Sequence, residues 1–378
     1  MFILHLFSNW KWTGPAEHAL NLCHLLKSRG HRVVFACGRP PSADLDNIKA
    51  RAEALGVDTL ELRLRKHLNV LDNSVDAWAI SRYMKAERPD IIHSHMANDN
   101  LVAGVSAMLA GASVPLVRTS YDGDGMKATL RNRTLMSRLT TGLVVVSERA
   151  RVADTENFHL RPERVWKVEV GVDTERFSPP PLEKRLDARK AMGIGPEEVV
   201  VGVVARIQWH RRFDVFLDAF KRASERMPEL SAVLVGRGTN RVPVAIEPAR
   251  KMGLDGKIVF PGYLHGDRYV DALACMDLKV FLVPGTDGSC RAVREAMAMG
   301  LPIIAARRGM LPEIVEHEKN GLVVDDTPEN LAEAIEALAS DESLRRRMAE
   351  TSRRIAVERF SLDKEAQDVE AVYEALLA

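Results

Sequence analysis

Short apolar runs alternate with amphipathic segments along this chain, and the alternation is interrupted once, near the middle. The runs in the first half span residues 2–7, 32–36, 91–94, 116–119 and 142–146. Those in the second half span residues 199–204, 232–235, 258–260, 279–283 and 302–305. Apolar runs of this length, separated by helical patterns, predict mostly parallel sheets covered by helices on both faces. We therefore expect an α/β protein.

The interruption is a Pro-rich and charged stretch, F-S-P-P-P-L-E-K-R, which begins at Phe177 and has no periodicity. Such a stretch is typical of a linker. A chain of 378 residues is also longer than one ordinary core requires. We predict two Rossmann-like, doubly wound domains, residues 1–178 and 179–360, that face a central cleft. Ligands of such sheets bind at the carboxyl ends of the strands.

The composition excludes several classes of protein. The formal net charge is +1, which gives no argument for nucleic-acid binding. The four cysteines have no paired spacing, so we expect a reduced, cytoplasmic protein. No apolar stretch reaches the roughly 18 residues that span a bilayer. The loop after the first run lacks the G-x-G-x-x-G spacing of a dinucleotide site, and we find no metal-binding motif or His/Cys cluster, so we expect no cofactor and no metal.

The segment 283–321 has the most specific pattern in the chain. A strand ends at its first residue, a Gly-bearing turn follows, and a helix begins. Unpaired N–H groups at a helix start bind anions such as phosphate. Asp287 and Glu295 lie eight positions apart across this helix start. A phosphate site flanked by two carboxylates suits a nucleotide-sugar, in which phosphates lie between two hydroxyl-rich sugars.

The same segment also contains A-M-A-M-G-L-P, P-E-I-V and N-G. With these motifs it resembles the retaining glycosyltransferases of family 4, which have the two-lobed GT-B fold and an E-x7-E signature. Asp287 departs from the signature, and Met310 replaces the second Gly of a G-G pair. The resemblance implies that Glu295 binds the ribose hydroxyls and that Asp287 lies near the donor sugar. Without the rest of the pattern, a helix cap and a surface residue would explain this pair better.

The helix start itself has the sequence S-C-R-A, where the family usually has an aromatic residue, Gly and aliphatic residues. The resemblance implies that Ser289 lies in the donor site and that the backbone N–H groups of Cys290, Arg291 and Ala292 face the distal phosphate. The side chain of Arg291 either adds charge to the phosphate site or points to solvent. A nucleophilic Cys290 is a weaker alternative.

Two arginines follow the first strand of the second half. Arg206 and Arg211 match the basic positions of the family pattern G-R-x-x-x-x-K-G, and Arg212 stands where that pattern has Gly. The resemblance implies that both arginines bind the diphosphate; surface arginines at a helix start are the alternative. Preorganised cations and a helix N-terminus can stabilise a leaving diphosphate without a metal.

Glycine turns end the next two strands, in L-V-G-R-G and V-F-P-G-Y. By resemblance, Gly236 lies in the donor site and Tyr263 lies near the nucleobase. Strand-ending glycines are common, so these signals are weak. Tyr263 packs either on the base or in the core.

The first domain is expected to supply further contacts. In the loop after its first strand, Gly14 takes the place of a family glycine that approaches the donor phosphates and the acceptor. Trp10 and Trp12 in the same loop could stack on a sugar or touch lipid, although simple packing is more common for such residues.

The motif P-D-I-I-H-S-H-M follows the family's D-x-x-H-x-H pattern. His95 would contact the donor or acceptor sugar, and His93 is expected to be structural. Tyr121 and Asp122, at the end of the next strand, are candidate acceptor contacts. The residues expected to be catalytic are Asp287, Arg206, Arg211 and His95.

The resemblance implies transfer of a sugar, with retention, from a nucleoside-diphosphate sugar to a saccharide or lipid-linked acceptor, as in the assembly of cell-surface polysaccharide or lipopolysaccharide. A nucleotide-sugar 2-epimerase of the same fold and a catalytically silent sugar-nucleotide-binding protein are the alternatives. The last helix, within 361–378, is expected to pack back on the first domain. The basic, partly apolar segment 127–138 is either an ordinary solvated helix or a contact with the anionic inner face of a membrane.

Overall fold

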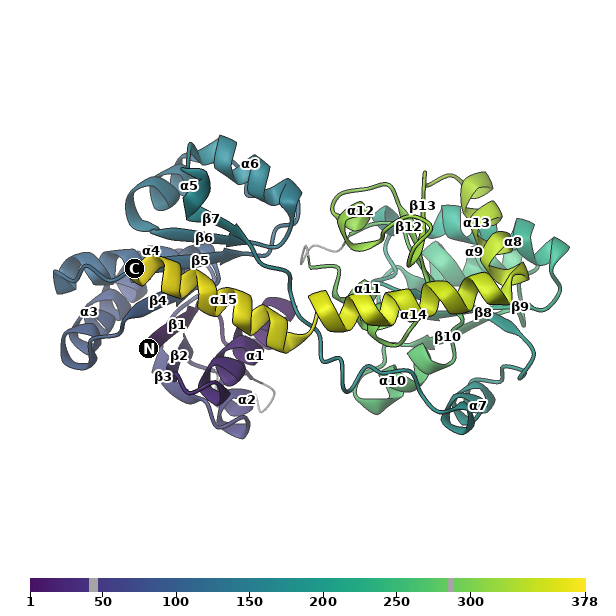
Figure 1. Ribbon diagram of the computed structural model, residues 1–378, viewed down its shortest axis with the longest axis horizontal. Coiled ribbons are helices and arrows are strands. Elements are labelled where there is room, and N and C mark those ends of the chain that lie inside the picture. The colour runs from purple at the N-terminus through teal and green to yellow at the C-terminus, as the bar shows by residue number, and fades with distance from the viewer. Residues whose placement is uncertain (41–46, 285–288) are drawn as a thin grey trace. The chain divides into compact units, whose positions relative to one another are not determined.

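The computed structural model of the chain describes residues 1–40, 47–284 and 289–378. These residues form two compact α/β units, coloured mainly purple to teal and teal to yellow-green in Figure 1. Unit 1 is built mainly from Met1–Gly171 and Leu362–Ala378, and unit 2 is built mainly from the chain between them, with Ser289 assigned to unit 1. From the sequence, the corresponding boundaries are predicted at residues 178 and 360. No helix in the described part of the chain is long and apolar enough to cross a bilayer.

Unit 1 contains one parallel sheet with the strand order β3-β2-β1-β4-β5-β6-β7 among the described residues. Its strands are β1 (Phe2–Phe7), β2 (Arg32–Gly38), β3 (Asp58–Leu62), β4 (Ile91–Ser94), β5 (Leu116–Ser120), β6 (Gly142–Val145) and β7 (Val165–Lys167). Its helices include α1 (Gly14–Ser28), α2 (Ile48–Ala54), α3 (Val70–Glu87), α4 (Ala97–Ala110), α5 (Leu130–Thr134), η1 (Leu135–Leu139), α6 (Glu148–Phe158) and η2 (Pro162–Arg164). Apolar side chains of alternate strand positions form one core on each face of the sheet.

The C-terminal helix α15 (Leu362–Leu377) belongs to unit 1 and packs beside α1. It buries Val369, Val372 and Tyr373 in the core on that face of the sheet. At its first turn, the carboxylate of Glu365 accepts a 2.7 Å hydrogen bond from the backbone N–H of Gly171. The last helix of the chain is therefore held on the first unit by both apolar packing and a buried hydrogen bond.

Unit 2 contains a second parallel sheet, with the strand order β10-β9-β8-β11-β12-β13 among the described residues. Its strands are β8 (Val199–Val204), β9 (Leu230–Val235), β10 (Ile258–Gly262), β11 (Leu278–Phe281), β12 (Ile303–Ala306) and β13 (Gly321–Val324). Its helices include α7 (Leu182–Ala191), η3 (Trp209–Arg211), α8 (Phe213–Arg226), η4 (Val242–Ile246), α9 (Glu247–Lys251), α10 (Asp267–Ala274), α11 (Arg291–Ala298), α12 (Leu311–Ile314), α13 (Pro328–Ser340) and α14 (Glu342–Arg359).

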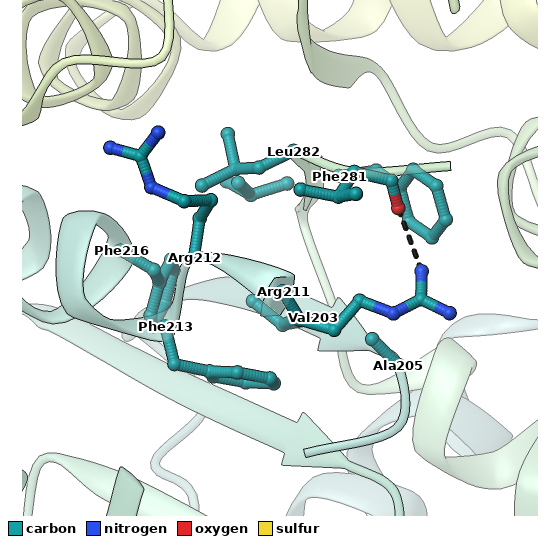
Figure 2. Close-up of a pocket in the computed structure, with 10 residues that line it drawn as sticks. Val203, Ala205, Arg211, Arg212, Phe213, Phe216, Phe281 and Leu282 are labelled. Carbon is teal, nitrogen blue, oxygen red and sulfur yellow. Dashed lines mark hydrogen bonds between the residues drawn. The ribbon is translucent and has the colours of Figure 1, made fainter. Parts of the chain in front are cut away.

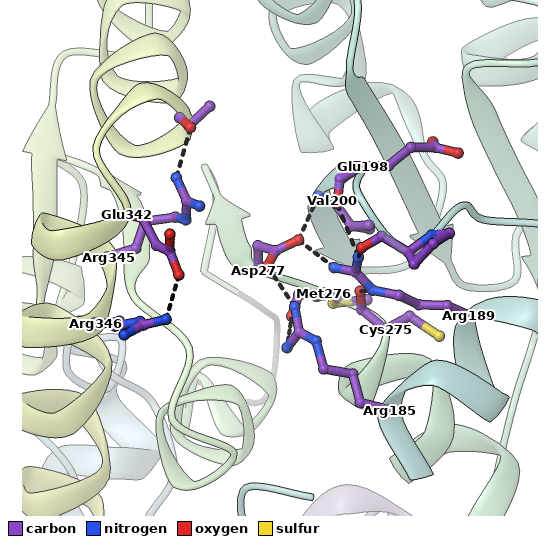
Figure 3. A network of polar contacts seen from close by, with 12 residues as sticks. Arg185, Arg189, Glu198, Val200, Cys275, Met276, Asp277, Glu342, Arg345 and Arg346 are labelled. Atoms are coloured by element: carbon purple, nitrogen blue, oxygen red, sulfur yellow. Dashed lines mark hydrogen bonds and ion pairs between the residues drawn. The ribbon is translucent and has the colours of Figure 1, made fainter. Parts of the chain in front are cut away.

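The predicted linker is only partly a linker, because α7 begins inside it at Leu182. Two arginines of α7 converge on one carboxylate, as Figure 3 shows: Arg189 donates to Oδ2 of Asp277 at 2.5 Å, and Arg185 donates to Oδ1. The same Oδ2 accepts a 2.8 Å hydrogen bond from the backbone N–H of Val200, the second residue of β8. The expectation of an unstructured linker through residue 185 is therefore wrong, because these contacts fix α7 to the sheet of unit 2.

Candidate functional site

The carboxyl ends of β8, β9 and β10 are joined by close backbone contacts in unit 2. The N–H of Ala205 donates to Val235 at 3.1 Å, and the N–H of Gly236 donates to Gly262 at 2.8 Å. A Cβ atom on Gly236 would lie 1.9 Å from the carbonyl oxygen of Ala205. Glycine is therefore required at position 236 by the approach of the neighbouring loop. Its predicted contact with the donor stays a prediction.

The two arginines predicted to bind diphosphate lie in the loop and short helix after β8. Arg206 is exposed, and its guanidinium makes no hydrogen bond or ion pair with any residue that the structure describes. Arg211, at the end of η3, donates through Nη1 to the carbonyl oxygen of Val283 at 2.8 Å, as Figure 2 shows. Because Val283 follows β11, this bond brings Arg211 to the carboxyl end of that strand, where the segment 283–321 begins.

Arg212, which replaces the family's Gly, has a left-handed backbone with φ 59°. This conformation is unfavourable for a non-glycine residue and needs support from its surroundings. Nη1 of Arg212 donates to Oδ2 of Asp326 at 2.8 Å, and Arg308 donates to the same oxygen at 2.6 Å. The side chain that departs from the pattern thus ties the start of α8 to the loop before α13.

Glu295 is buried in α11, and both of its carboxylate oxygens have partners. The hydroxyl of Tyr269, from α10, donates to Oε2 at 2.6 Å, and Nε of Arg291 lies 3.1 Å from Oε1. Phe177 packs edge-to-face against the Tyr269 ring at 5.9 Å. Arg291 therefore pairs with Glu295, an outcome outside the two alternatives that the sequence offered. Tyr269 was missed because no motif surrounds it.

A second residue near Glu295 was also missed. Lys279 lies fully buried in β11, and its ammonium donates to the carbonyl oxygen of Ala292 in the first turn of α11. Burial lowers the pKa of Lys279 to about 7, against an opposing effect of the Glu295 charge. The lysine in the otherwise apolar run K-V-F-L-V could have indicated a buried polar contact beside this strand, because lysine is almost never fully buried without a partner.

Cys290 and Ser289 are the other predicted residues at the start of α11 that the structure describes. Cys290 caps α11 with a left-handed backbone, φ 48°, and its thiol is buried. A buried thiol is poorly suited to nucleophilic catalysis, so this weaker alternative has no support here. Ser289 is buried directly before it. Asp287 lies outside the described residues.

Tyr263 does not pack in the core, because 59% of its surface is exposed. The guanidinium carbon of Arg237 lies 4.6 Å from the centre of the Tyr263 ring, and His265 packs edge-to-face on it at 6.1 Å. The core alternative for Tyr263 is therefore wrong. Its predicted contact with a nucleobase stays a prediction.

In unit 1, two of the predicted residues meet at the carboxyl ends of β4 and β5. Nδ1 of His95 lies 3.0 Å from the Tyr121 hydroxyl, and its Nε2 lies 3.0 Å from Nδ1 of His5. The ring of His18, from α1, stacks on Tyr121 at 5.9 Å. The sequence proposed His95 and Tyr121 separately, and their predicted sugar and acceptor contacts stay predictions. It missed His5 and His18, which lie within patterns of buried apolar residues.

His93 is buried in β4, two residues before His95, and both of its ring nitrogens have partners. It forms hydrogen bonds of 2.5 Å with the Tyr373 hydroxyl of α15 and 2.7 Å with Oγ1 of Thr119. These contacts connect three elements of unit 1 through one imidazole. They agree with the structural role expected of His93.

Three histidines gather in this core, so the expectation that the chain has no histidine cluster is wrong. His5, His93 and His95 offer ring nitrogens within 4.8 Å of one another. Nδ1 of His5 and Nε2 of His95 lie within hydrogen-bond distance of each other, at 3.0 Å, and both ring nitrogens of His93 have partners in Tyr373 and Thr119. As placed, the cluster is a set of hydrogen-bonded rings. The predicted absence of a metal stays a prediction.

We expect this cluster to make the protein less stable in acid. Burial lowers the pKa of His5 to about 3, from 6.5, and holds the pKa values of His93 and His95 well below their usual range. The folded protein keeps these rings neutral, while the unfolded chain binds protons below about pH 6.5. The stability contribution is therefore fully present above pH 6.5 and is lost as the pH falls, by about 1.4 kcal/mol per pH unit for each ring.

The measurement is urea unfolding of the wild type and of His5→Gln across pH. Because one titrating ring is removed, the variant should gain roughly 2–3 kcal/mol relative to the wild type between about pH 6 and pH 4. Burial raises the pKa of Asp99 to about 7 and that of Asp154 to about 6, and these opposing contributions cancel in the comparison. Parallel pH profiles for the two proteins would contradict a neutral, buried His5.

The other predicted residues of unit 1 have ordinary packing. Trp12 packs against the core beneath α1, with the Arg51 guanidinium 4.3 Å from its ring. Trp10 is partly buried, and its carbonyl oxygen accepts a 3.0 Å bond from the N–H of Ile48. Gly14 begins α1, and Asp122 is exposed and accepts a 3.1 Å bond from the N–H of Asp124. Their predicted ligand contacts stay predictions.

Comparison with known proteins places both units in one class of enzymes. The family described as "Glycosyltransferase Family 4" matches residues 12–176, and that described as "Glycosyl transferases group 1" matches residues 184–355. The chain is 30% identical over 317 residues to a D-inositol 3-phosphate glycosyltransferase of Jonesia denitrificans, covering 75% of this chain and 71% of the relative. It is also 30% identical over 218 residues to the lipopolysaccharide core biosynthesis mannosyltransferase LpsB of Rhizobium meliloti, covering 55% of this chain and 60% of the relative.

Solved structures share the fold over nearly the whole chain. A glycosyltransferase from Rickettsia africae aligns with TM-score 0.85 at 16% identity, covering 100% of this chain and 98% of that one. Anabaena Alr3699/HepE, solved in complex with UDP, aligns with TM-score 0.81 at 20% identity, covering 98% and 99%. The predicted GT-B class of two Rossmann-like α/β units is confirmed. On this evidence the chain belongs to family 4 of the glycosyltransferases.

Proposed function

We propose that the protein transfers a sugar from a nucleoside-diphosphate sugar to a saccharide or lipid-linked acceptor, with retention and without a metal ion. Membership of the family supports glycosyl transfer. The Anabaena neighbour was solved with UDP and with UDP-glucose, which makes a UDP-sugar the first donor to test. The names of LpsB and of the lipopolysaccharide outer core galactosyltransferase WaaB favour an acceptor in lipopolysaccharide or another cell-surface glycan.

One observation carries this proposal: the buried carboxylate of Glu295 is held at the first turns of α11 by Tyr269 and Arg291. An ionised carboxylate has about four lone-pair sites, so these two contacts leave capacity for further donors. Two vicinal ribose hydroxyls would supply them through charge-assisted hydrogen bonds. Because its neighbours already fix the carboxylate, little side-chain freedom would be lost when the nucleotide binds.

The diphosphate would lie where cationic and amide donors meet. Arg206 and Arg211 follow β8, and Arg211 already reaches the end of β11. We propose that both guanidinium groups and the N–H groups that open α11 stabilise the charge that develops on the leaving diphosphate. Asp287 and His95 would position the donor sugar, and the leaving phosphate would take the proton of the acceptor hydroxyl.

The ribose contact predicts that Glu295→Gln loses nucleotide affinity. Replacing the charge removes hydrogen bonds to a charged acceptor, which are worth about 1.5–3 kcal/mol, so affinity should fall roughly 10- to 150-fold. The measurement is the thermal stabilisation of the protein by UDP, GDP, ADP and dTDP, because ligand binding raises the apparent stability by mass action. Glu365→Gln, which alters a buried glutamate in unit 1, is the matched control. If nucleotides stabilised Glu295→Gln as much as the wild type, the proposed binding of ribose by Glu295 would be contradicted.

The activity itself is tested with radiolabelled nucleotide-sugars and candidate lipid or oligosaccharide acceptors. Labelled acceptor supports transfer, and the anomeric configuration of the product tests retention. Full activity in the presence of a chelator tests independence of metal. Conversion of the donor alone would instead indicate the 2-epimerase, and binding without either reaction would indicate a silent binding protein.

We also propose peripheral contact of unit 1 with the anionic inner face of a membrane, where a lipid-linked acceptor would be presented. The segment 127–138, suggested by the sequence, is a poor candidate for this contact. Its apolar residues Leu135 and Met136 are buried in unit 1, and only Leu130 is prominent, with 83% of its surface exposed. The apolar side of this helix therefore packs against its own unit.

A further inference from the structure

Helix α3 leaves an apolar stripe uncovered on unit 1. Its inner side packs beside α4, with Ile80 and Met84 in the core. Its outer side presents Leu71, Val75 and Trp78, spaced i, i+4 and i+7, and we call these three residues the α3 stripe. The exposed fractions of Leu71 and Trp78 are 79% and 56%. Contiguous exposed apolar groups of this kind mark interaction sites more often than isolated ones do.

Two further apolar side chains extend the surface at the start of the helix. Leu68 and Val70, on either side of the N-cap Asn69, are exposed as well. The stripe is thus wider at its N-terminal end than a single row of residues. Among the described residues, unit 1 has no other helix with so many large apolar side chains turned outward.

Cations border the α3 stripe at both ends, and the described carboxylates nearby face elsewhere. Arg82 and Lys85 continue the same helical line, and the Arg82 guanidinium lies 5.0 Å from the Trp78 ring. At the other end, Arg63 and Arg65 pair with the buried Asp72, and Lys66 is exposed.

The remaining acids of this region do not offset these charges at the surface. Asp76 is buried and accepts from the backbone N–H groups of Arg63 and Leu64. Glu87 is paired with Arg32. The exposed line of the helix is therefore apolar in its centre and positive at its ends.

We propose that the α3 stripe docks unit 1 onto an anionic lipid bilayer. Leu, Val and Trp would enter the interface between headgroups and acyl chains, and Arg82, Lys85 and Lys66 would contact anionic headgroups. The inference deepens the proposed function by naming the surface that brings the enzyme to a lipid-linked acceptor. The membrane contact rests on the proposed function only in so far as the acceptor is taken to be lipid-linked.

Charge favours a lipid surface over a second copy of the chain. Two α3 stripes packed antiparallel would place Arg82 and Lys85 of one copy against the basic end, at Lys66, of the other. Two stripes packed parallel would place equivalent cations against each other. Like charges brought together across an interface oppose association, whereas an anionic surface satisfies both basic ends at once.

The test is co-sedimentation of the full chain with vesicles. We expect binding to phosphatidylcholine vesicles containing about a quarter phosphatidylglycerol, and weaker binding to phosphatidylcholine alone. Leu71→Ser/Trp78→Ser should lower the partition coefficient by about tenfold or more. The matched control is Leu182→Ser/Trp209→Ser, which removes an equally exposed leucine and tryptophan, at 69% and 65%, from unit 2 and should bind as the wild type does.

A second variant separates charge from apolar contact. Arg82→Gln/Lys85→Gln should lose most of the preference for phosphatidylglycerol while retaining the residual binding to phosphatidylcholine. The proposal is overturned if the Leu71→Ser/Trp78→Ser protein and the control bind alike. It is also overturned if sedimentation velocity shows a dimer that the stripe variant dissociates, because a second copy would then be the occupant. No donor or acceptor is present in these measurements, so a failure here is distinct from a failure of the transfer assay.

Discussion

Replacing Asp277 with Ala should lower the free energy of unfolding of unit 2 by about 3–5 kcal/mol, because the change leaves a buried cation without its partner. Asp277 accepts from Arg185, from Arg189 and from the backbone N–H of Val200 (Figure 3). Arg189 is buried, and its other donors go to backbone carbonyls such as that of Pro196 at 2.8 Å. The variant therefore keeps the buried guanidinium and loses the negative charge that compensates for it.

Urea unfolding followed by circular dichroism measures this loss. The matched control is Glu329→Ala, which breaks an exposed ion pair with Arg222 of α8 and should cost less than about 1 kcal/mol. If both variants lost the same small amount, Asp277 would be no more than a surface partner of α7. A large loss confined to Asp277→Ala would show that the chain entering unit 2 is held by this carboxylate.

Arg206→Ala should reduce the rate of sugar transfer by about 10²–10³-fold while leaving the stability nearly unchanged. The loss follows because the variant lacks one of the cations proposed to stabilise the charge that develops on the leaving diphosphate. The unchanged stability follows because the Arg206 side chain is exposed and makes no hydrogen bond or ion pair with the described residues. A combined loss of activity and stability would instead indicate a structural role.

Steady-state rates at saturating donor, together with the melting temperature, separate these outcomes. Arg250→Ala serves as the control. Arg250 is also exposed, but it lies near the end of α9 and so precedes the amino end of β10, whereas ligands of such sheets bind at the carboxyl ends of the strands. A kcat for Arg206→Ala that stays within tenfold of the wild type would mean that the leaving diphosphate does not need this cation. In that case Arg211 and the N–H groups of α11 would have to stabilise the charge.

Three strands that the sequence did not reveal, β3, β7 and β13, each lie at the edge of a sheet. β3 has the sequence D-T-L-E-L and is only half-buried at the edge of its sheet, and β7 has three residues. β13 has four residues and also forms an edge. The longer strands β1 and β8 lie inside their sheets, are apolar except at His5 and Gly202, and were found. Edge strands are covered on fewer sides, so their sequences need less apolar character.

By itself, the sequence determined the α/β alternation, the family and the spacing of Arg206, Arg211 and Glu295, because burial in parallel strands and ligand binding at their ends both restrict residue types locally. Only the tertiary structure decided which residues contact one another across elements. It set Tyr269 against Glu295, His5 against His95 and Asp326 against Arg212, partners separated by 26, 90 and 114 positions. It also decided that the apolar side of segment 127–138 is covered and the outer side of α3 is not. Periodicity reveals which residues share a face of a helix, but whether another element covers that face depends on how the whole unit packs.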